Sequence, residues 1–188
     1  DTSADLDYVS VRALTVTGGA ISDVTGNEAD YSLPDPASPA SLAGGAAIMV
    51  DTTPPSAPTS VSLTTSTDTG RSRTDGVTNV TAVSVTGTAE DASVVTLFDN
   101  DTEIAGATGT ASAGTFTITT TLATGNHAIT AKATDAAGNT SDPSLILPVT
   151  VDQVAPTVIS VSSTVNPGAY RAGTTIPIYI SFTEPVFV

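Results

Sequence analysis

One phrase occurs twice in this chain and limits what the chain can fold into. A hydrophobic run ends in Val-Asp and is followed by proline, first at residues 50–55 (VDTTPP) and again at residues 151–156 (VDQVAP). These two seams are separated by about 100 residues, a common size for a small domain. Each seam follows a second repeated phrase, Asp-x-x-Gly-Asn, at residues 23–27 and 135–139. Repetition at a fixed distance predicts an array of modules rather than one enzyme domain.

The residues between the seams alternate with the period of a β-strand. In residues 115–122 (TFTITTTL), Phe116, Ile118 and Leu122 share one face and threonines coat the other. Residues 127–134 alternate in the same way, with Ile129, Ala131 and Ala133 inward and Thr130, Lys132 and Thr134 outward. Further strand-like stretches lie at residues 56–64, 80–87, 93–98 and 144–151. Several short strands joined by turns predict an antiparallel β-sandwich.

The chain is strongly acidic. It carries 19 acidic and 5 basic residues, a formal net charge of −14. Such a charge repels nucleic acid phosphates and anionic lipid headgroups, so neither is expected as a partner. Two explanations of the acidity remain open. Divalent cations held through oxygen ligands stabilise the mutually repelling carboxylates, or the charge keeps the protein soluble.

Signals of disulfides, membrane spans and secretion are missing from the sequence. The chain contains no cysteine, which rules out disulfides and thiolate metal sites without deciding the compartment. No stretch approaches the roughly 20 apolar residues of a membrane-spanning helix, so membrane insertion is not expected. Residues 1–5 (DTSAD) have neither the basic nor the apolar region of a signal peptide. We therefore expect an interior piece of a longer protein.

The regions outside the seams also contain strand-like stretches, but fewer of them. They lie at residues 13–17, 29–33 and 46–50 before the first seam, and at residues 157–162 and 175–182 after the second. We therefore expect three units. Residues 1–51 are the C-terminal strands of one repeat, residues 52–152 are a complete repeat, and residues 153–188 are the N-terminal strands of another.

Several phrases match a known family. GTAE at residues 87–90, GNH at 125–127 and AKATDAAGN at 131–139, together with the seams, resemble bacterial Ig-like repeat domains of large secreted adhesins and related surface proteins. The flanks resemble a second type of Ig-like repeat from the same proteins, through GAYRAG at residues 168–173 and GGAISDVTGN at 18–27. The resemblance implies tandem immunoglobulin-like antiparallel β-sandwiches, one complete and two partial, at the cell surface or outside the cell. Such families are generally calcium-dependent, so calcium is the expected cofactor.

An Ig-like sandwich brings three separated segments together at the pole where the linker enters. They are the linker, the loop between the second and third strands, and the loop between the last two strands. Their side-chain oxygens are the ligands that calcium takes in sets of about six to eight. The predicted calcium ligands are Asp51, Glu90, Asp91, Asp135 and Asn139. The alternative for residues 135–139 is an ordinary turn capped by Asp135, in which Gly138 and Asn139 adopt positive φ.

A second junction is expected where residues 153–188 of one chain pair with residues 1–51 of the next. Its predicted calcium ligands are Asp152 and Glu184 from one chain and Asp23 and Asn27 from the other. Pairing of this kind is heterologous, and it generates a filament when it does not close into a ring. The competing explanation is that the chain is a fragment of a longer repeat protein.

The polar stretch at residues 66–79 contains a third candidate group. For Asp68, Asp75 and Asn79, a cation site and a solvated loop are both open explanations. Residues 99–101 (DND) are expected to form a plain turn. An EF-hand is excluded, because no Asp-x-Asp-x-Asp-Gly loop closed by a glutamate is present.

Catalytic chemistry has little support in the sequence, and no enzyme activity is expected. His127, the single histidine, begins a strand and is expected to pack or form hydrogen bonds there. No Gly-x-Ser-x-Gly elbow occurs. Tryptophan is absent, which argues against an aromatic platform for carbohydrate.

The expected function is a structural stalk module of an extracellular bacterial adhesin or surface protein, stiffened by calcium at module junctions. The alternative is a self-assembling filament or surface-layer subunit built by the strand pairing described above. The expected partners are neighbouring Ig-like repeats or copies of the chain itself. Any host or surface ligand is expected to bind through other parts of the parent protein.

Overall fold

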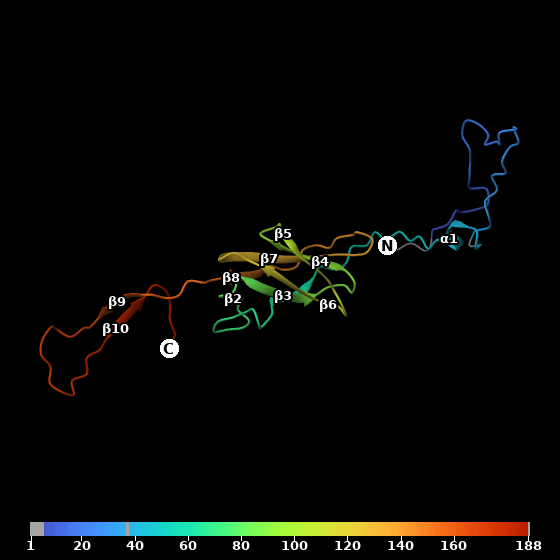
Figure 1. Ribbon diagram of the computed structural model, residues 1–188. Helices are drawn as coiled ribbons and strands as arrows, with labels where there is room; N and C mark the ends of the chain where they lie inside the picture. The colour runs from blue at the N-terminus through green and yellow to red at the C-terminus, as the bar shows by residue number, and fades with distance from the viewer. Residues whose placement is uncertain (1–5, 37, 188) are drawn as a thin grey trace.

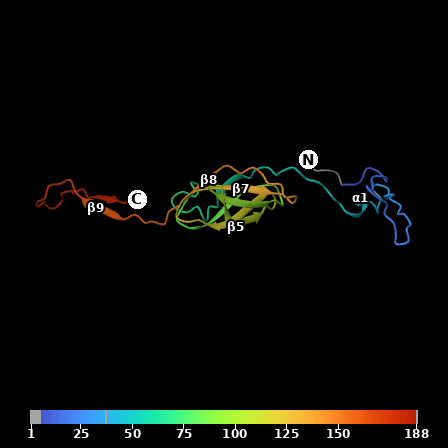
Figure 2. The same ribbon diagram turned by 90° about the horizontal axis from the view of Figure 1, so that it is seen from above.

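The computed structural model describes residues 6–36 and 38–187. Its regular structure is almost entirely β, with one short helix. A β-sandwich lies in the middle, with an N-terminal segment at one end and a β-hairpin at the other (Figure 1). The view from above shows the same extended arrangement (Figure 2). The predicted all-β class is confirmed.

Eight strands form the central sandwich. Their bounds are β1 (Thr59–Leu63), β2 (Val77–Thr78), β3 (Ala82–Thr88), β4 (Val94–Asp99), β5 (Thr102–Thr110), β6 (Thr115–Thr121), β7 (Gly125–Thr134) and β8 (Leu147–Val151). One sheet has the order β1-β3-β6 and the other β2-β8-β7-β4-β5. Paired strands are antiparallel except β2 and β8, which are parallel. The predicted antiparallel sandwich is therefore confirmed.

The alternation predicted for residues 115–122 places its apolar side chains in the core. Phe116, Ile118 and Leu122 are all buried. β6 pairs with β3 over the full length of both strands. On β3, a Cβ added to Gly87 would come within 2.8 Å of two carbons of the Phe116 ring. Glycine at position 87 therefore allows this aromatic ring to pack directly against the neighbouring strand.

The hydrophobic core contains fifteen buried residues that lie between positions 63 and 151. They are Leu63, Val83, Val85, Val95, Leu97, Ala107, Ala111, Phe116, Ile118, Leu122, Ile129, Ala131, Ala133, Val149 and Val151. The inward side chains predicted for β7 are among them. Thr130, predicted to point outward, is nevertheless only 6% exposed, because β7 is flanked by β4 on one side and β8 on the other.

β5 is absent from the sequence prediction. Its sequence, TEIAGATGT, includes two glycines, and Ala107 is its single fully buried residue. A strand at the edge of a sheet with one buried side chain lacks a clear alternating pattern. The turn before β5 forms as predicted. Asn100 and Asp101 have φ of 47° and 63°, the left-handed conformation of a tight hairpin turn.

The N-terminal segment, residues 6–36 and 38–50, has little regular structure. It contains the short helix α1 (Leu42–Gly45). The strands predicted at residues 13–17, 29–33 and 46–50 do not form in this described segment, where the isolated bridge Ser22↔Glu28 is found instead. Strands need neighbours that satisfy their backbone and cover one face, and no sheet lies beside this segment.

The C-terminal hairpin consists of β9 (Val158–Ser162) and β10 (Tyr179–Phe182), which pair antiparallel. The strand predicted at residues 157–162 therefore forms, whereas the one predicted at residues 175–182 forms only in its second half. All five residues of β9 are exposed. The hairpin repeats the antiparallel pairing of β1 with β3, but without an opposing sheet.

Candidate functional site

The Asp135 carboxylate closes a five-residue turn directly after β7. Its Oδ1 accepts the backbone N–H groups of Ala137 and Asn139, and its Oδ2 accepts the Asn139 side-chain amide, each at 2.9 Å. The Asn139 side-chain bond is the largest cause of a pKa for Asp135 below its usual value. Gly138 has φ of 93°, whereas Asn139 is not at positive φ. The predicted turn is therefore correct for the aspartate cap and for Gly138, and wrong for Asn139.

The other copy of the phrase, at residues 23–27, folds into the same turn. Asp23 Oδ1 accepts the N–H groups of Thr25 and Asn27, and Oδ2 accepts the Asn27 side-chain amide. These bonds hold the pKa of Asp23 far below its usual value, with the Asn27 side chain as the largest cause. The repeated phrase thus produces a repeated local structure.

The two turns differ in what else the asparagine amide binds. Asn139 Nδ2 donates to the backbone carbonyl of Asp51 at 3.1 Å, although 88 positions separate the two residues. Asn27 Nδ2 instead donates to the Thr25 hydroxyl at 2.9 Å, within its own turn. The Asn139 bond ties the linker to the end of the sandwich at which it enters. We call this end the linker pole.

The two seam aspartates, Asp51 and Asp152, each stabilise a local turn. Asp51 Oδ1 accepts the N–H of Thr53 at 3.0 Å, and Asp152 Oδ1 accepts the N–H of Val154 at 2.9 Å. Such turns, in which an aspartate accepts the N–H two residues ahead, are a common use of this side chain. Each seam therefore begins its linker with the same type of turn.

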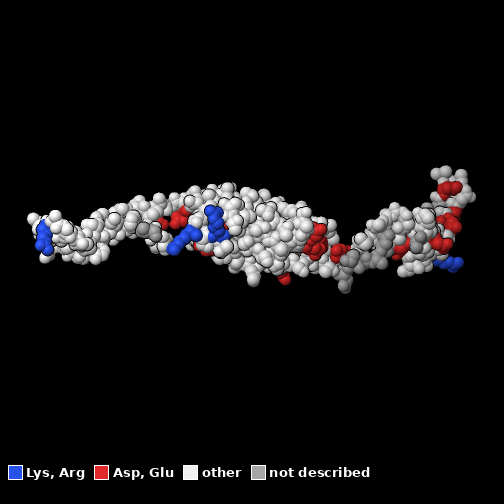
Figure 3. Space-filling model, turned by 90° about the horizontal axis from the view of Figure 1, so that it is seen from below, with Lys and Arg blue, Asp and Glu red and all other residues white. Residues whose placement is uncertain are grey.

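Four of the five ligands predicted for the first junction border one open cavity at the linker pole. Asp51, Glu90, Asp91 and Asp135 line a space of about 450 Å³. Figure 3 shows acidic side chains gathered at this end of the central sandwich. Across the described ranges, however, no three carboxylate or imidazole side chains converge closely enough to hold a metal ion. The structure thus forms an acidic cavity whose carboxylates do not meet at one point.

The ligands predicted for the second junction lie at opposite ends of the chain. Asp23 and Asn27 belong to the N-terminal segment, whereas Asp152 directly follows β8 and Glu184 follows β10. The N-terminal segment and the hairpin of β9 and β10 lie at opposite ends of the sandwich (Figure 1). A single chain does not bring these residues together. Their prediction concerned a contact between chains, which one copy of the chain does not test.

The structure brings together only two of the three residues in the third candidate group, Asp68, Asp75 and Asn79. Asp68 is buried, with 2% of its surface exposed, and it borders a cavity of about 300 Å³ together with Asp75. Asn79 lies outside the lining of that cavity, and its Oδ1 accepts the Thr69 hydroxyl at 2.7 Å. The burial of Asp68 distinguishes it from a residue of a solvated loop.

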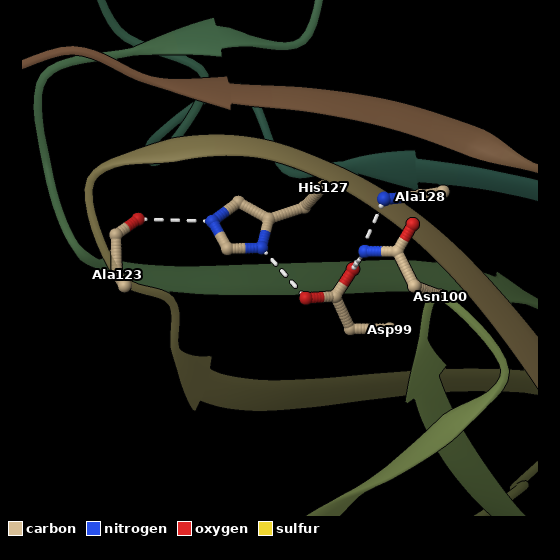
Figure 4. Close-up of polar contacts among 5 residues, drawn as sticks. All are labelled: Asp99, Asn100, Ala123, His127 and Ala128. Atoms are coloured by element: carbon tan, nitrogen blue, oxygen red, sulfur yellow. Dashed lines mark hydrogen bonds and ion pairs between the residues drawn. The ribbon is translucent and has the colours of Figure 1, made fainter.

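His127 forms hydrogen bonds through both ring nitrogens (Figure 4). Nδ1 lies 2.7 Å from Asp99 Oδ2, and Nε2 lies 2.9 Å from the carbonyl oxygen of Ala123. Asp99 also accepts the backbone N–H of Ala128 and the side-chain amide of Asn100. Asp99, Ala123 and His127 form what we call the histidine clasp. It joins the end of β4 to the start of β7, as the prediction of a hydrogen-bonding histidine requires.

Sequence reasoning did not find the role of Asp99. In the sequence it belongs to an ordinary turn, 28 positions before His127. The two meet because β4 pairs with β7, with Asp99 opposite Ile129. Knowledge of the strand order, together with the single histidine, would have identified this pair.

Two packed, mainly antiparallel sheets joined by turns and loops, with linkers entering and leaving at opposite ends, define an immunoglobulin-like β-sandwich module. Among the described residues, no helix is long and apolar enough to span a membrane.

Residues 54–153 match the bacterial Ig-like domain family. This match covers more than half of the chain, and the chain belongs to that family. A comparison with curated proteins finds no match. Domains of this family are generally structural modules without enzymatic activity, and they typically occur in surface proteins. The resemblance seen in the sequence is therefore confirmed for the central module.

Proposed function

We propose that this chain is a stalk segment of an extracellular bacterial adhesin or surface protein, in which calcium stiffens the hinge between modules. The observation that carries the proposal is the linker pole. There the Asn139 amide fixes the linker at Asp51, beside a cavity lined by Glu90 and Asp91. A stalk needs its modules to keep a fixed orientation, and a bond from the last turn to the linker favours one orientation.

Electrostatics supports a cation at this pole. Asp51, Glu90, Asp91 and Asp135 line the cavity without a lysine or arginine among the lining residues. In the described part of the chain, none of the four forms an ion pair with a basic side chain. Calcium accepts carboxylate, backbone carbonyl and water oxygens in a flexible arrangement. A bound ion would draw the carboxylates together and remove their mutual repulsion.

Thermal unfolding with and without calcium tests this proposal. A ligand that binds only the folded state stabilises it by about 2.7 kcal/mol when its free concentration is about 100 times Kd. The chelated chain should therefore unfold at a lower temperature than the calcium-loaded chain. The double variant Glu90→Gln with Asp91→Asn should show a clearly smaller difference than the wild type, whereas Asp101→Asn, at an exposed turn of the opposite pole, should keep the full difference. Equal unfolding temperatures for the chelated and loaded wild type would refute the proposal.

Small-angle scattering reports on the hinge itself. Calcium should narrow the distribution of overall dimensions, because the linker and the sandwich would share one ion. The Glu90→Gln with Asp91→Asn variant should keep the broader distribution in both conditions. Identical scattering of the wild type in chelator and in calcium would contradict a stiffened hinge.

A filament subunit is the second candidate, and the exposed C-terminal hairpin favours it. In this candidate, residues 153–188 of one chain complete the sandwich begun by residues 1–51 of the next. β9 and β10 repeat the pairing of β1 with β3, and β9 leaves its apolar side chains exposed. Asp152 and Glu184 would then meet Asp23 and Asn27 of the neighbouring chain.

Light scattering after size separation distinguishes the two candidates. A filament subunit should give species whose mass grows with concentration, and Val161→Lys on β9 should abolish them. The wild type remaining a monomer at all concentrations, with its hairpin protected from proteolysis, would eliminate the filament candidate and leave the stalk.

A further inference from the structure

A buried carboxylate lies in the first loop, residues 64–76 between β1 and β2. Asp68 is 2% exposed, and its Oδ2 accepts the backbone N–H of Gly76 at 3.2 Å. Its Oδ1 is also buried and has no hydrogen-bond partner among the described residues. Ionised groups that are removed from water are normally paired with a counter-charge or coordinated to a metal. One half of this carboxylate has neither kind of partner.

The loop holds the Asp68 carboxylate in place. The Asp68 N–H donates to the Thr64 carbonyl at 2.9 Å, and the Thr78 hydroxyl donates to the Thr67 carbonyl at 2.7 Å. Gly76 has φ of 74°, and a Cβ added there would lie 2.4 Å from the carbonyl oxygen of Pro148 on β8. The loop therefore packs against β8 through a glycine whose N–H is bound by Asp68. This packing holds Asp68 Oδ1 in a buried position without a hydrogen-bond partner among the described residues.

The cavity beside Asp68 offers further oxygen atoms. It has a volume of about 300 Å³, and its lining includes Thr65, Thr74 and Asp75. Asp75 Oδ1 accepts the backbone N–H of Val77 at 3.1 Å. The side-chain oxygen of an asparagine in place of Asp75 could accept the same hydrogen. Hydroxyl, carboxylate and backbone oxygens of this kind are the ligands of hard cations.

The arginines of the first loop are engaged elsewhere. The Arg73 guanidinium borders the cavity but donates to the Thr65 carbonyl at 2.7 Å. Arg71 lies over the Phe187 ring, 4.2 Å from its centre. Neither forms an ion pair with Asp68 in the described structure. The counter-charge that a buried carboxylate requires is therefore not supplied by the loop itself.

We propose that Asp68 and Asp75 hold a hard divalent cation, calcium being the best fit, inside the first loop. Calcium tolerates irregular loops and takes backbone carbonyls and water along with carboxylates, whereas magnesium demands a near-octahedral shell. The ion fixes the loop against β8 near the pole where the second linker leaves. The site shares no residue with the cavity at the linker pole and does not depend on a cation there.

The Gly76 amide gives a local readout of this site, because its N–H is bound to Asp68 itself. In nitrogen–proton correlation spectra of the full chain, calcium added after chelation should shift the Gly76 resonance in a saturable way. Asp68→Asn should abolish the shift, and Asp75→Asn should lower the calcium affinity by roughly tenfold or more. The Glu90→Gln with Asp91→Asn variant should keep the Gly76 response, which separates this site from the linker pole.

Other occupants of the cavity give different results. If a water molecule or a proton satisfies Asp68, millimolar calcium leaves the Gly76 resonance of the wild type unchanged, and the proposal is overturned. A Gly76 shift that persists in Asp68→Asn overturns it as well. If Asp68→Asn does not fold, Asp75→Asn decides, because wild-type calcium affinity in that variant is incompatible with the proposed site.

Discussion

Replacing His127 with glutamine should destabilise the central sandwich at acidic pH more than at alkaline pH. Both ring nitrogens of His127 face acceptors, the Asp99 carboxylate at 2.7 Å and the Ala123 carbonyl at 2.9 Å. A neutral imidazole has one N–H and can satisfy only one of them, whereas the imidazolium donates to both. The clasp therefore favours the protonated ring.

The direction of the pKa shift follows from these contacts. Burial lowers the pKa of His127, but the hydrogen bonds to Asp99 and Ala123, helped by the Asp99 charge, outweigh burial and raise it. A hydrogen bond to a charged group contributes about 1.5–3 kcal/mol. The His127 side chain is 10% exposed and the Asp99 side chain is 25% exposed, so solvent screens part of this contribution and the lower half of the range applies. We expect His127→Gln to lower the free energy of unfolding by about 2 kcal/mol at pH 5.5.

The stabilisation depends on pH with a defined sign. Because the folded pKa lies above the unfolded value of about 6.5, the clasp contributes fully below pH 6.5 and is lost as pH rises through the folded pKa. Urea unfolding of the wild type and of His127→Gln should therefore differ most at pH 5.5 and converge toward pH 9. Asp99→Asn should flatten the same profile, and Asp101→Asn, at the neighbouring exposed turn, should leave it unchanged.

Proton spectra give an independent check, because the chain has a single histidine and hence one set of imidazole signals. Titration of the folded protein should give a His127 pKa above 6.5. A pKa at or below 6.5, or a stability difference between wild type and His127→Gln that does not change between pH 5.5 and pH 9, would refute the reasoning.

Three further substitutions test the packing and the linker. Leu97→Ala, at a fully buried core position, should lower the free energy of unfolding by about 3–5 kcal/mol in urea, and a loss below 1 kcal/mol would contradict the core described above. Gly76→Ala should cost about 2 kcal/mol or more in the same assay, because its Cβ would meet a β8 carbonyl at 2.4 Å and its φ is positive. Asn139→Ala should increase the nanosecond mobility of the linker around Asp51 in nitrogen-15 relaxation, whereas Asn27→Ala, which removes the equivalent turn bonds but no linker bond, should not.

The sequence predicts those strands in which apolar and polar residues clearly alternate. Phe116, Ile118 and Leu122 are spaced so that only one face of β6 is apolar, and all three are buried. β5 lacks such a pattern because it lies at a sheet edge with Ala107 as its one fully buried residue. The N-terminal segment has strand-like stretches that form no strands, whereas β9 forms in the C-terminal flank, where β10 pairs with it. A pairing partner is needed in addition to periodicity for a strand to form.

Some features of the candidate sites also depend on nearby residues in the sequence, and others depend on contacts between distant residues. The Asp135 turn is encoded within five residues and could be predicted as a turn. The geometry of the Ig-like fold predicts that Asp51, Glu90 and Asp91 lie at the same pole, and the structure places all three around one cavity. The burial of Asp68 could not be predicted, because a polar stretch gives no sign that its loop packs against β8.

The two copies of Asp-x-x-Gly-Asn form the same turn, but their asparagine amides bind different partners. In both turns the aspartate accepts the asparagine amide, but that amide has a second hydrogen to donate. At residue 25 the central threonine presents a hydroxyl that accepts it, so the turn is complete within itself. At the equivalent position, Ala137 has no acceptor in its side chain, and the Asn139 amide binds the linker carbonyl of Asp51. Thr25 therefore lets its turn close on itself, whereas Ala137 leaves one hydrogen of the Asn139 amide for the linker.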